Sequence, residues 1–259
     1  MEPLALFFFA HQDDEFGVFE HIVRARASGQ RVCCAYLTSG VAEQNSPTRR
    51  NSESTRVLLQ LGVAPADIHF PGQELGIADA HLVRHIERAV DWIATWLAGL
   101  SSVASAYLPA WEGGHHDHDA LHAAVLLAAR RTTSGARLRQ FPLYNAYHCP
   151  SPFFRVFKPL PVNGPAEHLP IPWRRRLRFL RYCLSYPSQA KSWAGLLPFT
   201  ILHYVLRGIE SEQDVSLQRL RERPHPGPLY YERRGFCTWP EVQQAVWACV
   251  QHELPVGAA

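Results

Sequence analysis

Two short segments of the sequence concentrate side chains that bind divalent metal ions. The first is residues 10–15, AHQDDE, and the second is residues 113–119, GGHHDHD. A catalytic zinc site uses three protein ligands drawn from His, Asp, Glu or Cys and leaves one position for water. Bound zinc lowers the pKa of that water towards about 7, and a nearby carboxylate that is not a ligand can take its proton. The two segments together indicate metal-dependent hydrolysis.

Each segment has a plainer interpretation when it is taken alone. Residues 11–14 fit a helix N-terminus, where acids cap free N–H groups and favour the helix dipole. Residues 115–118 fit a solvated glycine-rich loop. His118 and His122 also have the i, i+4 spacing with which two histidines on a helix bind zinc, but we interpret His122 as a structural helix residue. It is the presence of both segments in one chain that favours the metal site.

The elements that would position these segments alternate along the chain. Strands are predicted at residues 5–10, 31–37, 68–70, 103–108 and 138–144, and helices at 17–27, 48–61, 81–97 and 119–131. Such βαβ units predict an α/β fold, a Rossmann-like doubly wound, mostly parallel sheet with helices on both faces. If the strand order is 3-2-1-4-5, the first and fourth strands are neighbours. Both polar segments then converge at the switch point, where ligands bind.

The alternation stops near Cys149, where proline becomes frequent. We therefore predict a core domain over residues 1–148 and a C-terminal extension over residues 149–259 that packs on the core and walls the site. The extension contains a run of arginines between Arg174 and Arg181. This run suits a solvated helix face, a contact for an anionic substrate or a contact with a membrane surface. The apolar stretch beside it keeps the membrane interpretation open.

Bulk composition excludes several classes of protein. A chain of 259 residues with 47% hydrophobic residues can bury one large α/β core. A formal net charge of +3 is too small for a general nucleic-acid binder. The six scattered cysteines favour reduced thiols and a cytoplasmic protein. Residues 1–9 predict a buried strand rather than a signal peptide, and no run reaches the roughly 20 apolar residues of a membrane span.

The same residues resemble the signatures of the PIG-L/LmbE-like family of zinc-dependent N-deacetylases. AHQDDE is similar to the family's AHPDDE, and GGHHDHDAL at residues 113–121 is similar to its second motif, GGHPDHDA. RNSE at residues 50–53, followed by LG, resembles the family's R-x-x-E…LG stretch. RPHPG at residues 223–227, followed by LYYE, resembles the tail of some bacterial members. The similarity covers most of residues 4–148 and is patchier beyond.

The resemblance implies a role for each matching residue. His11, Asp14 and His118 would hold the zinc ion, although iron(II) fits the same set of ligands. Asp13 would be the general base that takes a proton from the attacking, metal-bound water. His115 would stabilise the oxyanion of the tetrahedral intermediate and protonate the leaving amine.

The environment of the catalytic histidine is defined by Asp117 and by two positions at which this sequence departs from the family. Asp117 would hold His115 in the correct tautomer, as carboxylates behind a catalytic or ligating histidine do. Gln12 and His116 replace two prolines of the family, so two fixed φ angles are lost from these turns. His116 is also a second histidine that competes with His115 for the same role, so which of the two is catalytic stays open.

The predicted substrate-binding residues surround this centre. The resemblance implies Arg50 as a substrate anchor and His225 as a pocket residue. Aromatic residues near the ends of the fourth and fifth predicted strands suit the stacking of sugar rings, although packing in the core explains them equally well. The predicted set is Arg50, Trp111, His116, Tyr147 and His225.

The function that the resemblance implies is zinc-dependent hydrolysis of an N-acyl amide on an amino sugar, such as N-acetylglucosamine, or on a glycoconjugate. A hydrolase of a non-sugar amide or an ester remains an alternative, because function resides in the site rather than in the fold. A non-catalytic binding module is the third possibility, and the intact ligands and base argue against it. The sequence leaves the substrate, the acyl length, the native metal and the oligomeric state open.

Overall fold

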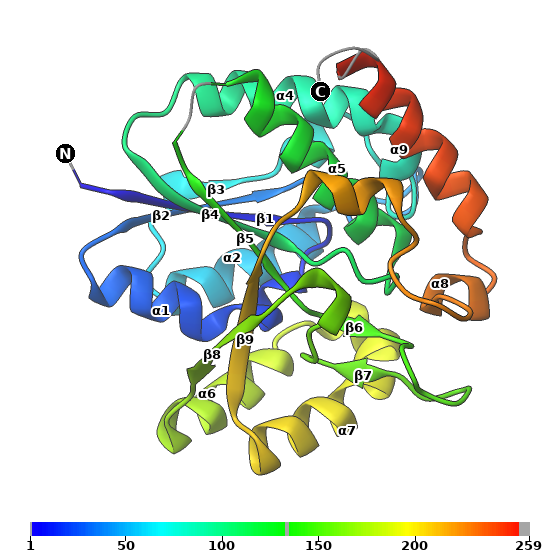
Figure 1. Cartoon of the computed structure of the whole chain (residues 1–259). Coiled ribbons are helices and arrows are strands. Elements are labelled where there is room, and N and C mark those ends of the chain that lie inside the picture. The colour runs from blue at the N-terminus through cyan, green and yellow to red at the C-terminus, as the bar shows by residue number, and fades with distance from the viewer. Residues whose placement is uncertain (1, 133–134, 254–259) are drawn as a thin grey trace.

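Five parallel strands form the centre of the structure, a computed structural model that describes residues 2–132 and 135–253 (Figure 1). They are β1 (Leu4–Phe9), β2 (Arg31–Tyr36), β3 (Ile68–His69), β4 (Val103–Pro109) and β5 (Arg137–Phe141). The seven-stranded sheet has the order β3-β2-β1-β4-β5-β9-β8. The order predicted for the first five strands is confirmed.

Helices cover both faces of this sheet, as predicted for the α/β fold class. α1 (Phe19–Ala27) and α2 (Thr48–Gln60) lie on one face, and α4 (Ile86–Ala98), α5 (His116–Arg131) and α9 (Trp239–Glu253) lie on the other (Figure 1). β1 is apolar and buried along its whole length because both of its faces are covered. Its alternate residues separate into two cores, with Phe8 packing in the cluster of α4 and α5 and Phe7 in the cluster of α1 and α2.

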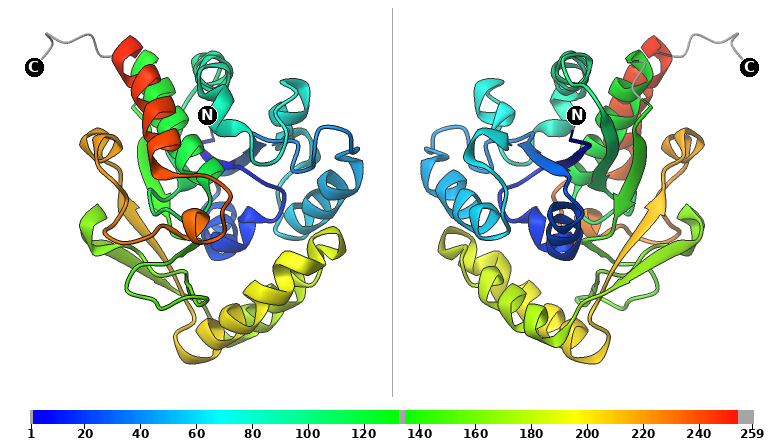
Figure 2. Two further views of the ribbon diagram at one scale, coloured as in Figure 1. Left: turned by 90° about the vertical axis from the view of Figure 1, so that its right-hand side faces the viewer. Right: turned by 90° about the vertical axis from the view of Figure 1, so that its left-hand side faces the viewer.

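Besides α9, the chain after Cys149 adds two antiparallel strands to the main sheet, two further long helices and several shorter elements. β9 (Ile209–Asp214) pairs with β5, and β8 (Ala166–Pro170) pairs with β9. Between them, α6 (Trp173–Cys183) and α7 (Ala190–Leu206) lie side by side at the end of the molecule opposite α9 (Figure 2). β6 (Tyr144–Asn145) and β7 (Arg155–Val156) form a separate two-stranded sheet.

The shorter elements explain most differences from the predicted boundaries. They are α3 (Pro71–Glu74), α8 (Tyr230–Arg233) and 3-10 helices at Asp14–Gly17, Pro65–Asp67, Leu82–His85, Pro161–Asn163, Pro187–Gln189 and Leu217–Arg221. The first predicted helix begins late, at Phe19, because a 3-10 turn precedes it. The helix predicted at residues 119–131 begins early, at His116, so most of the second polar segment forms the first turn of α5 rather than a loop.

Two expectations drawn from composition concern the whole chain. All six cysteines are free thiols, as predicted. Across the described residues, no helix is both long and apolar enough to cross a lipid bilayer.

Candidate metal centre

The two polar segments meet at the carboxyl ends of β1 and β4, which pair in parallel. The second segment needs its two glycines to reach this position. Gly113 has a φ of +68°, in the left-handed region that side chains other than glycine rarely adopt. A Cβ atom on Gly114 would lie 2.1 Å from the carbonyl oxygen of Tyr144 in β6, so only glycine allows this close approach.

Three buried side chains from the two segments converge there. His118 Nε2 lies 3.0 Å from Asp14 Oδ1 and 3.3 Å from His11 Nδ1. His11 Nδ1 lies 3.6 Å from Asp14 Oδ2. Atoms that bind one zinc ion tetrahedrally at about 2.0–2.1 Å lie about 3.3 Å from one another. The donor atoms of His11, Asp14 and His118 therefore have the chemistry, burial and spacing of a metal-ligand set.

Carboxylates surround His11 on its other side. His11 Nε2 lies 3.1 Å from Asp117 Oδ2 and 3.2 Å from Asp79 Oδ1. Burial alone would lower the pKa of His11, but Asp79, Asp117 and Asp14 raise it well above its usual value. This excess of negative charge favours a cation at the centre. A carboxylate behind a ligating histidine is also the usual means of fixing the orientation of that ligand.

The position of Asp117 corrects its predicted role. Its carboxylate accepts hydrogen bonds from the backbone N–H groups of Ala80 and Leu82, at 2.7 and 2.9 Å, and contacts His11 rather than His115. The backbone N–H of Asp117 donates to His115 Nδ1 at 3.2 Å. Because Asp117 lies in the first turn of α5 and His115 is its N-cap, the main chain of Asp117 bonds to the His115 ring. The Asp117 carboxylate lies near both His11 and His115, but its hydrogen bond is to His11.

Asp13 lies beside this cluster in an unusual backbone conformation. Its φ is +133°, which side chains other than glycine rarely adopt and which costs free energy. The carboxylate accepts hydrogen bonds from Trp193 Nε1 of α7 at 3.1 Å and from Arg50 Nη2 at 3.2 Å. Burial raises the pKa of Asp13 to about 7, although Arg50 acts in the opposite direction. A carboxylate is most effective as a general base when its pKa lies near the pH at which the protein works.

Arg50 was predicted as a substrate anchor, but its guanidinium is engaged within the protein. It is buried and donates to the carbonyl oxygens of Gly40 and Gln12 as well as to Asp13. It therefore positions the Asp13 carboxylate and the turn that precedes it. The side chain of Gln12 stabilises the same turn by donating to Asn51 Oδ1 at 2.8 Å, which offsets the missing proline.

The two candidate catalytic histidines have different environments. His116 is buried at the first position of α5, and its Nε2 lies 3.0 Å from the carbonyl oxygen of Ala80. His115 is half-buried, and its ring centroid lies 4.6 Å from that of His11. Burial and the neighbouring His11 lower the pKa of His115 well below its usual value, so this ring is neutral. These contacts favour His115 over His116 for contact with a substrate.

Two buried acids outside the ligand set, Asp119 and Glu112, hold the second segment and the start of β6 in place. Asp119 Oδ1 accepts the backbone N–H groups of Glu112 and Gly113, both at 3.2 Å. Glu112 Oε1 accepts the backbone N–H groups of Leu143 and Tyr144 at 2.7 and 2.9 Å, and burial raises the pKa of Glu112 to about 7. Such carboxylates satisfy backbone donors that the tight turns leave without partners.

The contacts of the other predicted pocket residues are with residues outside the ligand cluster. Trp111 is fully buried, and its indole N–H donates to the carbonyl oxygen of Glu222 at 3.0 Å, so its contacts are those of a core residue. Tyr147 and His225 meet each other, with ring centroids 5.5 Å apart. His225 is buried, and its Nδ1 lies 2.8 Å from the carbonyl oxygen of Pro226.

Sequence reasoning missed three residues that contact the centre. Asp79 and Trp193 contact His11 and Asp13 directly, and Tyr186 donates to Glu15 Oε1 at 2.9 Å. Glu15 in turn accepts the backbone N–H of Asp13 at 3.0 Å. All three missed residues come from segments without a local motif. Only the three-dimensional path of the chain brings them to the site.

Comparisons with known proteins agree with this geometry. Residues 6–129 match the sequence model of the PIG-L family, described as GlcNAc-PI de-N-acetylase. This match includes both polar segments and confirms the resemblance to the family over that range. No curated protein matches the chain.

Three solved structures share the fold with low sequence identity. A deacetylase of teicoplanin biosynthesis is 17% identical with a TM-score of 0.63, and the match covers 82% of this chain and 98% of the other. The zinc-inhibited form of teicoplanin deacetylase is 15% identical with a TM-score of 0.62, at the same coverages of 82% and 98%. The N,N'-diacetylchitobiose deacetylase of Pyrococcus horikoshii is 15% identical with a TM-score of 0.53, covering 82% of each chain.

Proposed function

We propose that this chain, which matches the PIG-L family model over residues 6–129, is a metal-dependent N-deacetylase that acts on an N-acetylated amino sugar or glycoconjugate. The observation that carries the proposal is the buried set of His11, Asp14 and His118, with a carboxylate outside that set, Asp13, beside it. The family match and the deacetylases that share the fold support the same reaction class.

His11, Asp14 and His118 would hold the metal, and their His2Asp donor set suits zinc or iron(II). Such an ion, when bound, polarises an amide carbonyl and lowers the pKa of a water molecule. The negative charge of Asp14, Asp79 and Asp117 around His11 supports a cation at this place.

Asp13 is the proposed general base. Its carboxylate is held from two sides by Arg50 and Trp193, so it needs no reorientation to accept a proton from the attacking water. Positioned acid–base groups of this kind contribute about 10²–10⁴-fold to rate. Arg50 and Trp193 are positioning residues in this proposal.

His115 is the proposed donor to the oxyanion. Because His115 Nδ1 accepts the backbone N–H of Asp117, the single proton of the neutral ring lies on Nε2. This nitrogen can donate a hydrogen bond to the carbonyl oxygen as negative charge develops on it. The proton that Asp13 takes from the attacking water can then pass to the leaving amine, which returns Asp13 to its carboxylate form. The tautomer is thus set by the main chain of Asp117 rather than by its carboxylate.

The C-terminal extension, proposed as residues 149–259, would complete the wall of the site. Trp193 and Tyr186 reach Asp13 and Glu15 from this part of the chain. The backbone N–H of Tyr230 donates to the carbonyl oxygen of Gly113 at 2.8 Å. These contacts support one functional unit built from both parts, with the extension supplying groups that position the catalytic turn.

The test is acetate release by the metal-loaded protein from N-acetylglucosamine and from larger N-acetylated glycoconjugates. We expect turnover of at least one of them, its loss on chelation and its recovery on reloading. Asp13→Asn should keep the metal and lose about 10²–10⁴-fold in kcat, and an exposed variant such as His148→Asn is the matched control. Turnover only of simple esters or of non-sugar amides would contradict the substrate class, and near-normal turnover of Asp13→Asn would contradict the role of Asp13.

A further inference from the structure

The segment that contains α6 and α7 has an unusual charge distribution. Between Glu167 and Glu210 the sequence contains no Asp or Glu. The same segment contains the lysine and arginine residues Arg174, Arg175, Arg176, Arg178, Arg181, Lys191 and Arg207. This segment is purely basic, although the whole chain has a net charge of only +3. Such a concentration of positive charge favours an anionic partner.

Three of the α6 arginines have no acidic partner in the part of the chain that the structure describes, although Arg178 hydrogen-bonds to Tyr182. Arg174, Arg178 and Arg181 recur at helical spacing on an exposed side of the helix, and no ion pair is found for them among the described residues. Arg175 and Arg176 behave differently, since Arg175 pairs with Glu20 and Arg176 donates to the carbonyl oxygens of Ile171 and Tyr204. The helix thus has structural arginines on one side and unpaired arginines on another.

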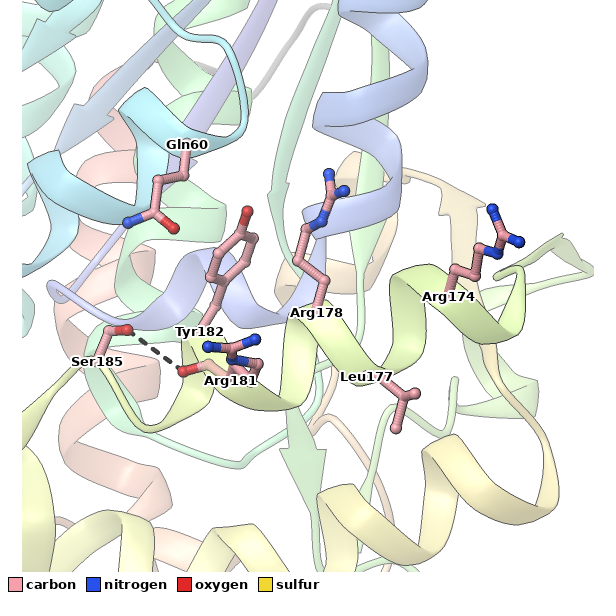
Figure 3. Close-up of a pocket in the computed structure, with 7 residues that line it drawn as sticks. All are labelled: Gln60, Arg174, Leu177, Arg178, Arg181, Tyr182 and Ser185. Atoms are coloured by element: carbon pink, nitrogen blue, oxygen red, sulfur yellow. Dashed lines mark hydrogen bonds between the residues drawn. The ribbon is translucent and has the colours of Figure 1, made fainter.

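The unpaired arginines line a cavity of about 630 Å³ between α6 and α2. Gln60, Tyr182 and Ser185 complete much of its wall. In Figure 3, Arg174 and Arg178 point to the side of α6 that faces Gln60, whereas Leu177 points the other way. A phosphate group fits this chemistry, because several guanidinium groups can share its oxygens.

An exposed apolar stripe runs along α6 beside the arginines. Trp173, Leu177 and Leu184 share one side of the helix, and 62% of Leu177 is exposed. The buried residues of α6 are Phe179, Tyr182 and Cys183, and Tyr182 also lines the arginine cavity. A helix with a basic face and a Trp- and Leu-containing face next to it is the pattern of helices that lie in a membrane interface.

The neighbouring helix extends this apolar surface. The buried residues of α7 are Trp193, Thr200 and Tyr204, and the residues on its open side are Ile201, Leu202, Val205 and Leu206. Leu206 is 71% exposed. Large apolar residues gathered on one exposed surface mark an interaction site. Figures 1 and 2 place α6 and α7 together at one end of the molecule.

We infer that the α6–α7 surface docks this protein on a bilayer that contains anionic phospholipids. Leu177, Leu206 and their neighbours would enter the interface, while Arg174, Arg178 and Arg181 would pair with lipid phosphates. A second copy of the chain fits less well, because a symmetric contact would bring the two arginine rows together. The inference does not rest on the proposed deacetylase activity.

The test is flotation of the full chain with vesicles of phosphatidylcholine alone and with vesicles that also contain phosphatidylglycerol. We expect binding to the anionic vesicles, and weaker binding as salt concentration increases. Arg174→Gln/Arg178→Gln/Arg181→Gln should weaken binding on the order of a hundredfold, since each basic residue contributes about fivefold. Leu177→Ser/Leu206→Ser should weaken it by about tenfold or more, because inserted apolar area is lost.

Matched control variants distinguish the effect of this surface from the effect of removing any exposed basic or apolar residues. Arg84→Gln/Arg88→Gln/Arg221→Gln and Val162→Ser/Trp247→Ser remove exposed residues elsewhere and should bind as the wild type does. Equal loss in test and control variants, or no binding of the wild type to anionic vesicles, would overturn the inference. It would also be overturned if the leucine variant bound normally while inorganic phosphate competed, because the arginine cavity would then be a site for a soluble anion. A dimer that these leucine substitutions dissociate, without any vesicle binding, would assign the surface to a second copy.

Discussion

At the scale of residues, the chemistry of the centre follows from side chains that the sequence places in two motifs. The ligand set His11, Asp14 and His118 could be proposed from residue type and from resemblance, and the structure brings these donor atoms to within 3.0–3.6 Å of one another. The contacts of Asp79 and Trp193 could not be proposed, because neither residue lies in a motif and both depend on tertiary packing. The hydrogen bond from Asp117 to His115 comes from the main chain rather than from the predicted carboxylate, since a motif shows which residues are present but not which of their atoms makes the contact.

Trp193 gives a direct test of how Asp13 is positioned. Trp193→Phe keeps an aromatic ring against Phe16 and Tyr186 but removes the N–H that donates to Asp13 Oδ2. A hydrogen bond to a charged group is worth about 1.5–3 kcal/mol, so we expect kcat to fall by about tenfold or more. KM and metal content should change little.

The control for that variant is Trp92→Phe, which alters a half-buried tryptophan on α4 that pairs with Trp96. Comparable losses of kcat in both variants would show that Trp193 acts through general stability. Loss of bound metal from Trp193→Phe would also contradict a role confined to Asp13.

At the scale of elements, the parallel strands and the helices between them could be predicted because their apolar periodicity is strong. α4 is an example, with Ile86, Val90, Ile93 and Leu97 all buried on one side. β9 could not be predicted, because its sequence IESEQD has three acids in six residues and no apolar alternation. The structure shows that these acids are held by partners from other elements, among them His21 of α1 and Arg139 of β5.

The contact between α1 and β9 predicts a dependence of stability on pH. His21 Nδ1 lies 2.6 Å from Glu210 Oε2, and His21 Nε2 lies 3.1 Å from Glu212 Oε2. Burial lowers the pKa of His21, but these two carboxylates outweigh it and raise the pKa from 6.5 to about 9. A raised pKa means that the charged form stabilises the fold. The contribution is complete below pH 6.5 and is lost as pH rises through about 9.

We therefore expect the wild type to lose about 2–3 kcal/mol of unfolding free energy between these two pH values relative to His21→Gln. Denaturant unfolding of both proteins across that range measures the difference. His168→Gln serves as the control, because His168 bonds to Ser211 of β9 without an acidic partner. Parallel pH profiles for the wild type and His21→Gln would contradict this assignment.

At the scale of the whole molecule, one α/β sheet brings two segments about a hundred residues apart to one edge. This convergence was predictable, since neighbouring parallel strands end at the same edge and the strand order follows from right-handed crossovers. The path of the chain after Cys149 was not, because short strands, prolines and an arginine-rich helix give no dominant period. That part of the chain nevertheless provides Trp193 to the centre and the α6–α7 surface to the outside.

The central claim is that His11, Asp14 and His118 hold a catalytic metal ion. It is tested most directly by elemental analysis of the protein purified without chelator, in parallel for wild type, His11→Ala, Asp13→Asn and the exposed control His148→Ala. We predict about one zinc or iron ion per chain in the wild type, Asp13→Asn and His148→Ala, and its loss from His11→Ala. A wild type that holds no metal even after reloading with zinc, or a His11→Ala variant with full occupancy, would contradict the account.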